Sequence, residues 1–264
     1  MTNKLHAAKH YFLHWLQAKR GGHGVHSPFV YELCEQVFYN TDQFYIFNKL
    51  NLLRKHLLID QRQLQIEDFG AGSHAFSGKS RKVADIAQKG ISSKKQSELL
   101  FRLIQHLKLK AGIELGTSLG LNTLYLAEAV GTGTVVSIEG STALHKFAKA
   151  LAEKNTNREI KFVPGKFDDV LPQLLNTLST LDFVYVDGNH REDATLRYFE
   201  MFLPKTHNNS VLVFDDIYWS AGMTTAWKTI CAHPKVKLSI DLYSTGLVFF
   251  REEIKEKQHL KLLV

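Results

Sequence analysis

The sequence predicts an α/β protein with a doubly wound, mostly parallel sheet, and three observations support this fold class. Short apolar segments alternate with helix-length segments after residue 110, which is typical of parallel strands joined by helical crossovers. The last two apolar segments are separated by only three residues, which indicates an antiparallel hairpin. The chain of 264 residues is 44% apolar and 22% charged, so it can bury a substantial core.

The composition excludes several protein classes. The two cysteines, Cys34 and Cys231, lie far apart and form no CxxC pair, so the sequence predicts neither a disulfide framework nor a zinc cluster. Lysines and histidines interrupt the N-terminal segment, which therefore lacks the apolar core of a signal peptide. No apolar run approaches the roughly 18 residues of a membrane span. We therefore expect a cytoplasmic protein without a membrane-spanning segment.

The first 110 residues are expected to be helical. In residues 4–19 apolar side chains recur at three- and four-residue spacing, which predicts an amphipathic helix that ends at a glycine cluster, residues 21–24. Its histidines, His6, His10 and His14, have no acidic or cysteine partner nearby in the sequence, so we expect them on an exposed helix face. Further helices are expected after the N-cap Ser27, at residues 44–58, at 82–88 and after Ser92 and Ser93, with a Gly- and Ser-rich loop at 70–80.

Charge divides the chain unequally. Residues 1–110 hold 17 Lys and Arg against 8 Asp and Glu, a net charge of +9, whereas residues 111–264 hold 16 against 18, a net charge of −2. A basic extension can steer an anionic substrate, a nucleic acid or a membrane surface toward a site, and a set of solvated helix faces explains it equally well. We expect residues 1–91 to form a basic helical cap and residues 92–264 to form the main domain.

Five apolar segments are the predicted parallel strands. They cover residues 112–115, 135–138, 160–163, 183–186 and 211–214. Residues 237–242 and 246–251 are the predicted antiparallel hairpin. In a doubly wound sheet, ligands bind at the carboxyl ends of the strands, so the residues that follow these segments are the candidate site residues.

The first predicted strand runs into a glycine-bearing turn. Glu114 precedes the turn, and Gly116 and Gly120 are spaced GxxxG before a helix. Gly116 lets the chain turn sharply and lets a ligand approach the backbone. Glu139 ends the second strand, 25 residues after Glu114, where a carboxylate can accept both hydroxyl hydrogens of a ribose. A carboxylate before the turn disfavours a pyrophosphate and favours an ammonium group, so the pattern points to a nucleoside-bearing cofactor other than a dinucleotide.

These residues resemble the first motif, ExGxxxG, of the class I S-adenosylmethionine-dependent methyltransferases. The resemblance implies a Rossmann-like methyltransferase fold and S-adenosylmethionine as the cofactor. It implies that the methionine end of the cofactor is lined by Glu114, Gly116, Ser118 and Asn122. It further implies that Glu139 holds the ribose and that residues 165–167, with Phe167, border the adenine.

Three carboxylates follow the fourth and fifth predicted strands. Asp187 follows the fourth strand, and Asp215 and Asp216 follow the fifth. Neighbouring parallel strands lie about 4.8 Å apart, so these carboxylates can converge on one ion. Three oxygen ligands suit Mg²⁺ or Ca²⁺ rather than a soft metal. The alternative is that one Asp caps a helix and another faces the solvent.

This half of the chain resembles the metal-dependent O-methyltransferases, including the catechol type and a group that acts on antibiotic sugars. The resemblance implies Mg²⁺ ligands at Asp187, Asp215 and Asp216, and Asp187 is expected to border the cofactor as well. His190 stands where the catechol type has its basic lysine, which makes catechol a poor guess for the acceptor. A histidine has an unperturbed pKa near 6.5, so His190 is the candidate base, and a merely structural hydrogen bond to Asp187 is the alternative.

Tyr218 and Trp219 follow the acidic pair and are expected either to border the acceptor or to lie in the core. His23, His26 and Ser27 resemble an N-terminal run found in a bacterial subgroup of these enzymes. We expect Mg²⁺-assisted methylation of a small hydroxylated acceptor, anionic or sugar-like, with a homodimer as one assembly. The alternatives are a metal-independent nucleic-acid methyltransferase, disfavoured because the fourth strand lacks an Asp/Asn-Pro-Pro-aromatic sequence, and a non-catalytic cofactor-binding module.

Overall fold

A computed structural model describes residues 2–21, 25–67 and 80–264 of the protein. The chain forms two compact units, one made of Met1–Asn40 with Pro172–Val264 and the other of Thr41–Leu171. This division does not follow the boundary expected between residues 91 and 92. The division into a cap and a main domain stays a prediction. The glycines at 22–24, with His23, and the loop residues 70–79 lie outside the described residues.

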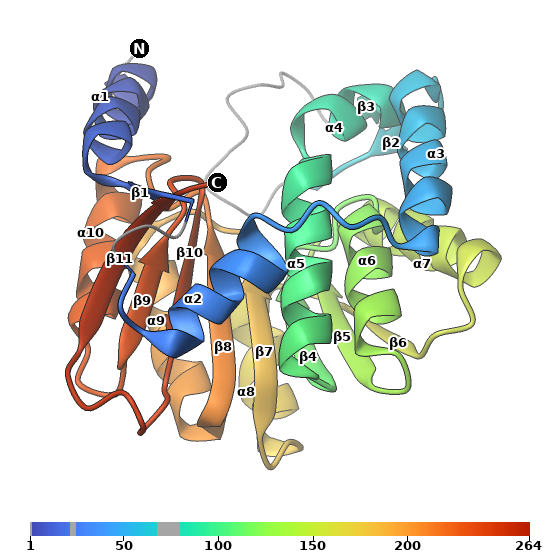
Figure 1. The fold of residues 1–264 in the computed structure, drawn as a ribbon. Coiled ribbons are helices and arrows are strands. Elements are labelled where there is room, and N and C mark those ends of the chain that lie inside the picture. Colours follow the sequence, from blue (N-terminus) through green and yellow to red (C-terminus); the bar gives the residue numbers. More distant parts are fainter. Residues whose placement is uncertain (1, 22–24, 68–79) are drawn as a thin grey trace. The chain divides into compact units, whose positions relative to one another are not determined.

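The unit Thr41–Leu171 contains three parallel strands (Figure 1). β4 (Ala111–Leu115) pairs with β5 (Thr134–Glu139), and β5 pairs with β6 (Ile160–Pro164). β4 and β5 are buried along most of their length, as expected for parallel strands covered on both faces. The three strands lie within two residues of their predicted positions. In this register Glu114 stands opposite Ser137.

Five helices of the residues that the structure describes belong to the same unit, and one of them begins at a predicted N-cap. α3 (Tyr45–Ile59), α4 (Val83–Lys89) and α5 (Lys94–Leu107) precede the strands, and α6 (Leu121–Val130) and α7 (Thr142–Asn155) connect them. The Ser93 side chain accepts a hydrogen bond from the backbone N–H of Gln96, 3.2 Å away, and so caps α5.

The prediction that all of this region is helical was wrong. β2 (Gln63–Gln65) and β3 (Ser80–Lys82) form a short antiparallel pair. Each strand has three residues, mostly exposed, so neither carries the apolar alternation that marks a strand in sequence.

The other unit holds the remaining strands (Figure 1). β7 (Leu181–Val186) pairs in parallel with β8 (Thr206–Asp215). β10 (Thr245–Phe249) pairs antiparallel with both β8 and β9 (Leu238–Asp241), which confirms the predicted hairpin. Because most strand pairs in both units are parallel and helices separate them, the predicted fold class is confirmed.

Two strands at the far end of this unit were not predicted. β11 (Gln258–Leu263) pairs in parallel with β9, and β1 (Lys19–Arg20) pairs in parallel with β11. β11, the partner of β1, lies at the opposite end of the sequence, so no local sequence pattern predicts this pair. The pairing of β1 with β11 places both ends of the chain in the same unit.

The helices of this unit include the first helix of the chain. They are α1 (Thr2–Gln17), α2 (Pro28–Leu33), a π-helical turn (Cys34–Phe38), α9 (Glu192–Phe202), a 3₁₀ turn (Leu203–Lys205) and α10 (Ala221–Ala232). α8 (Phe167–Asn176) runs from one unit into the other. In the parts of the chain that the structure describes, no helix combines the length and apolar character needed to cross a membrane.

The expectation of an exposed histidine face on α1 was wrong. His14 is 1% exposed, and His6 and His10 are half-buried. The reason is long-range: β9 and α10 supply polar partners for these side chains, although none is close in sequence. The apolar side of α1 consequently faces the solvent.

Candidate functional site

The turn between β4 and α6 requires glycine at two positions. Gly116 has φ = 97° and Gly120 has φ = 82°, both in the region that favours glycine. A Cβ on Gly120 would lie 2.8 Å from the Cβ of Ala148 in α7. The tight packing of α6 against α7 therefore fixes Gly120. Ser118, between the two glycines, also has a positive φ of 50°, so the whole turn is held in a strained shape.

Glu114 lies beneath this turn and is fully buried. Its carboxylate accepts hydrogen bonds from Asn122 Nδ2 at 3.0 Å, Thr123 Oγ1 at 2.5 Å and Ser137 Oγ at 2.6 Å. Burial raises the pKa of Glu114 to about 7, although these three hydrogen bonds oppose the shift. Glu114 thus ties β4, β5 and α6 together, and its predicted direct contact with a cofactor amine stays a prediction.

Asn122 carries an unsatisfied polar atom in the same place. Its side chain is 7% exposed, and its Nδ2 donates to Glu114. Its Oδ1 is buried and has no hydrogen-bond partner among residues 2–21, 25–67 and 80–264. A buried carbonyl oxygen without a donor is unfavourable by itself, which makes it a ready acceptor for an ammonium group of a ligand. Of the residues predicted for the methionine end, Asn122 therefore has the clearest capacity to bind.

Glu139 ends β5 with its side chain held by two backbone amides. Its Oε2 accepts from Ser118 N and its Oε1 from Ser141 N, each at 2.9 Å. A carboxylate oxygen can accept more than one hydrogen bond, so a strand-end acid of this kind suits the two hydroxyls of a diol. Sequence reasoning missed Ser141, two residues after Glu139, whose buried hydroxyl has no hydrogen-bond partner within the part of the chain that the structure describes. The pattern of a hydroxyl two residues after the strand-end acid was the signal for it.

The backbone next to Glu139 positions the predicted adenine segment. The N–H of Gly165 donates to the backbone oxygen of Glu139 at 2.9 Å. Gly165 has φ = 139°, and a Cβ there would lie 2.7 Å from Val170 Cγ2. Phe167, two residues further on, begins α8 and is half-buried. The structure thus brings Glu114, Ser118, Asn122 and Glu139 together, with Phe167 held on the adjoining loop.

The predicted metal ligands lie in the other unit, where a tyrosine joins two of them. Tyr185 is buried in β7, and its hydroxyl lies 3.3 Å from Asp187 Oδ2 and 3.1 Å from Asp215 Oδ2. The Thr245 hydroxyl donates to Asp215 Oδ1 at 3.2 Å. Sequence reasoning missed both hydroxyls. Because side chains two residues apart on a strand share a face, the position of Tyr185 before Asp187 was a usable signal.

His190 lies near two of the three carboxylates, Asp187 and Asp216. Its Nε2 lies 3.7 Å from Asp187 Oδ1 and 3.9 Å from Asp216 Oδ2. Asp216 has φ = 54° and its side chain is 42% exposed. Burial and the charge of Asp215 raise the pKa of Asp216 to about 6, and His190 opposes that shift. His190 thus lies near Asp187 and Asp216, and the convergence of all three carboxylates on one ion stays a prediction.

The donor set fits a hard cation by chemistry, but the described residues do not form a closed metal site. No group of three or more His, Cys, Asp or Glu side chains in residues 2–21, 25–67 and 80–264 is arranged to hold an ion. Carboxylate oxygens are the ligands that Mg²⁺ prefers, and the repulsion between Asp215 and Asp216 would be relieved by a cation.

The aromatic residues after the acidic pair separate into two environments. Tyr218 is 7% exposed and donates to Asp241 Oδ2 at 2.6 Å, so it is a core residue. Trp219 is 42% exposed. Of the two, only Trp219 is available to contact an acceptor.

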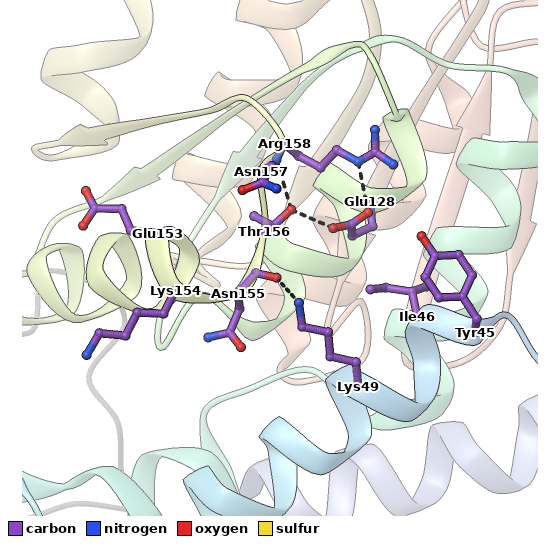
Figure 2. A pocket seen from close by; sticks show the side chains of 10 residues that line it. All are labelled: Tyr45, Ile46, Lys49, Glu128, Glu153, Lys154, Asn155, Thr156, Asn157 and Arg158. Carbon is purple, nitrogen blue, oxygen red and sulfur yellow. Dashed lines mark hydrogen bonds and ion pairs between the residues drawn. The ribbon is translucent and has the colours of Figure 1, made fainter.

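A separate cavity of about 530 Å³ lies in the unit Thr41–Leu171, and none of the predicted site residues lines it (Figure 2). Its walls come from α3, the end of α6 and the segment between α7 and β6. Figure 2 shows Lys49 Nζ donating to the backbone oxygen of Asn155, at 2.5 Å, and Arg158 paired with Glu128 at 3.0 Å. Two of its cations thus already have protein partners.

Comparisons with known proteins agree with this architecture. The profile of a family described as a methyltransferase domain matches residues 113–217. A catechol O-methyltransferase of Niastella koreensis is 28% identical over 143 residues. That match covers 51% of this chain and 62% of the relative, so the chain spans less than two thirds of the relative's length.

Solved structures of low sequence identity share the fold. The O-methyltransferase from Bacillus cereus in complex with S-adenosylhomocysteine has a TM-score of 0.56 and 18% identity, covering 79% of this chain and 92% of that chain. The O-methyltransferase TomG from Streptomyces achromogenes, involved in tomaymycin synthesis and solved with S-adenosylmethionine, also has a TM-score of 0.56 and 18% identity. It covers 84% of this chain and 95% of that chain.

Together, the strand pairing, the glycine turn and the structural neighbours show a class I methyltransferase fold, and residues 113–217 match a methyltransferase-domain profile. The relative and the structural neighbours named above are O-methyltransferases, and the chain is similar to them. The resemblance inferred from the sequence is confirmed at this level.

Proposed function

We propose that the protein transfers a methyl group from S-adenosylmethionine to a hydroxyl group of a small molecule. The observation that carries this proposal is the buried, unpartnered Oδ1 of Asn122 beside a turn whose second acid, Glu139, presents its carboxylate next to two backbone amides. One acceptor suits an ammonium group and the other suits a sugar diol. The cofactor would supply a sulfonium methyl group.

Each residue near the turn has a distinct part in binding. Asn122 Oδ1 accepts from the amino group, and Glu139 accepts from the ribose hydroxyls. Gly116 and Gly120 shape the backbone that the ligand approaches, while Phe167 covers the base. Glu114 positions the turn, because the hydrogen bonds that it accepts from Asn122, Thr123 and Ser137 hold the turn in place.

We further propose that Asp187, Asp215 and Asp216 hold Mg²⁺, which would lower the pKa of an acceptor hydroxyl. His190 Nε2, within 4 Å of two of these carboxylates, takes up the hydroxyl proton. The exposed ring of Trp219 provides an apolar contact for the acceptor. The acceptor class is a small hydroxylated molecule, anionic or sugar-like, because a cation site and a basic N-terminal region both favour negative charge.

Calorimetry with S-adenosylhomocysteine tests the cofactor assignment. Glu139→Ala and Asn122→Ala should each weaken binding about tenfold to a hundredfold, since each removes hydrogen bonds to a polar or charged ligand group. Glu153→Ala, an exposed acid on the wall of the separate cavity, is the matched control and should bind normally. Unchanged binding in both test variants contradicts the proposed cofactor site.

Metal binding is tested independently of the cofactor. The double variant Asp187→Ala and Asp215→Ala should lose Mg²⁺ binding in calorimetry and keep most of its affinity for S-adenosylhomocysteine. If the double variant retains the wild-type affinity for Mg²⁺, the metal proposal is wrong and the cofactor proposal is unaffected. His190→Ala should lower the methylation rate while leaving both affinities in place.

A further inference from the structure

α1 packs onto its unit with polar side chains. His14 lies 3.2 Å from Asp241 and 3.1 Å from the backbone oxygen of Leu262. His6 contacts the hydroxyl of Thr224 at 2.8 Å, and the ring of His10 stacks on Tyr218 with centroids 4.8 Å apart. The inner side of the helix is therefore its polar side, which reverses the usual arrangement of a surface helix.

Large apolar side chains occupy the opposite side. Leu5 is 76% exposed, Phe12 59%, Leu16 58% and Trp15 43%. We call these four residues the outer face of α1. The rings of Phe12 and Trp15 stack, with centroids 6.5 Å apart, so they form a continuous apolar surface. Contiguous exposed apolar surface of this kind marks a site of interaction.

The charge around the outer face is uniformly positive. Residues 1–31 contain four Lys and Arg and no Asp or Glu. Lys9 and Arg20 are exposed, and the Arg20 guanidinium lies 4.8 Å from the centre of the Trp15 ring. A helix with basic residues beside Trp, Phe and Leu suits the boundary between lipid headgroups and acyl chains, where its cations meet anionic headgroups.

We propose that the outer face of α1 binds the surface of a bilayer that contains anionic phospholipid, with the helix lying in the plane of the interface. The apolar side chains enter the headgroup region, and Lys9 and Arg20 pair with lipid phosphates. A second copy of the chain is the less favoured occupant, because pairing two such helices would bring their cations together with no acidic residue in either segment to balance them.

Vesicle sedimentation with the full chain tests this proposal. The protein should bind vesicles of phosphatidylcholine with phosphatidylglycerol, bind vesicles of phosphatidylcholine alone much less, and dissociate as salt is added. Phe12→Ser with Leu16→Ser should reduce the bound fraction at least about tenfold, since two apolar anchors are removed. Tyr45→Ser with Ile59→Ser is the matched control, because these side chains are 82% and 72% exposed on α3.

Trp15 supplies a second measurement. Its fluorescence should shift to shorter wavelength on adding anionic vesicles, and Trp15→Phe should remove that shift, although Trp219 and Trp227 remain. Normal binding of S-adenosylhomocysteine by all variants verifies their fold. The proposal is overturned if anionic vesicles are not bound, or if the control loses as much binding as the test variant. A dimer that Phe12→Ser with Leu16→Ser dissociates would assign the outer face to a second copy instead.

Discussion

Glu114 and Asp216 both follow or end strands of a largely parallel sheet, but their surroundings differ. Glu114 is fully buried and accepts three side-chain hydrogen bonds, which offset part of the cost of burying its charge. Asp216 is 42% exposed, lies next to the charge of Asp215 and has His190 at 3.9 Å. The Glu114 carboxylate thus has its hydrogen-bond partners within the protein, whereas Asp215 and Asp216 repel each other.

This difference separates an acid with internal partners from an acid that would bind a cation under the proposed function. A buried carboxylate with three donors holds the turn in shape whether a ligand is present or not. The cluster around Asp216 keeps unbalanced charge, because the charge of Asp215 disfavours the ionised form of Asp216. Such features concentrate where a ligand completes the structure.

Removing the structural acid should have the largest effect on stability. Glu114→Ala leaves the buried donors of Asn122, Thr123 and Ser137 unsatisfied and opens a cavity, so we expect the free energy of unfolding to fall by about 4 kcal/mol. Urea denaturation measures this change. A loss below about 1 kcal/mol would mean that the hydrogen bonds of Glu114 do not stabilise the turn.

The titration of Glu114 offers the next largest effect. Its pKa is raised from 4.5 to about 7 in the folded protein, so the folded state binds more protons than the unfolded state between these values. The stability contributed by protonated Glu114 is therefore complete below pH 4.5 and is lost as the pH rises through about 7. Glu114→Gln should gain on the order of 3 kcal/mol relative to wild type across this range.

Denaturation of both proteins at a series of pH values checks this expectation. Asp60→Asn is the control, because the hydrogen bond from Arg62 lowers the pKa of Asp60, and this variant should not gain with rising pH. Parallel curves for Glu114→Gln and wild type would mean that Glu114 is ionised throughout.

Much of the fold could be predicted because its signals are local. The alternation of apolar strands and helices, the Ser27 and Ser93 caps and the short connection between β9 and β10 each lie within a few residues of one another. β1 and β11 escaped prediction because their pairing joins the two ends of the chain. The inward face of α1 escaped for the same reason, since Asp241 is far from His14 in sequence.

The site could be predicted as residue positions but not as contacts. Glycine spacing and strand-end acids located Glu114, Gly116 and Glu139. The partners that decide what each acid does come from strand register, as when Ser137 stands opposite Glu114. A sequence alone therefore could not tell that Glu114 is satisfied internally while Asn122 Oδ1 is left without a partner.

The glycine of the cofactor turn allows strain and crowding to be separated. Gly120→Ala would place a Cβ 2.8 Å from Ala148 Cβ at φ = 82°, so we expect a loss of about 2 kcal/mol. Gly131→Ala is the matched control, because Gly131 has φ = 66° with nothing within 4 Å of an added Cβ. It should lose only about 1 kcal/mol, from strain alone. If thermal denaturation shows equal losses of stability for Gly120→Ala and Gly131→Ala, crowding by α7 does not explain the need for glycine at position 120.

The smallest effect is expected in the carboxylate cluster, where the substitution should raise stability, as it should for Glu114→Gln. The pKa of Asp216 is raised from 3.8 to about 6, so its contribution to stability is complete below pH 3.8 and is lost as the pH rises through about 6. Asp216→Asn should therefore be slightly more stable than wild type at pH 8, by less than about 1 kcal/mol because the side chain is partly exposed to solvent.

The gain in stability of Asp216→Asn should shrink as the pH approaches 4, because Asp216 of the folded wild type is then neutral like the asparagine of the variant. Asp193→Asn provides the contrast, because Asp193 pairs with Arg191 at 3.1 Å and its loss should not stabilise the protein. Adding Mg²⁺ should raise the melting temperature of wild type more than that of Asp216→Asn, since only the wild-type cluster keeps the repulsion that a cation relieves. If Asp216→Asn is instead the less stable protein at pH 8, the Asp216 carboxylate stabilises the fold, and the repulsion inferred for the cluster is wrong.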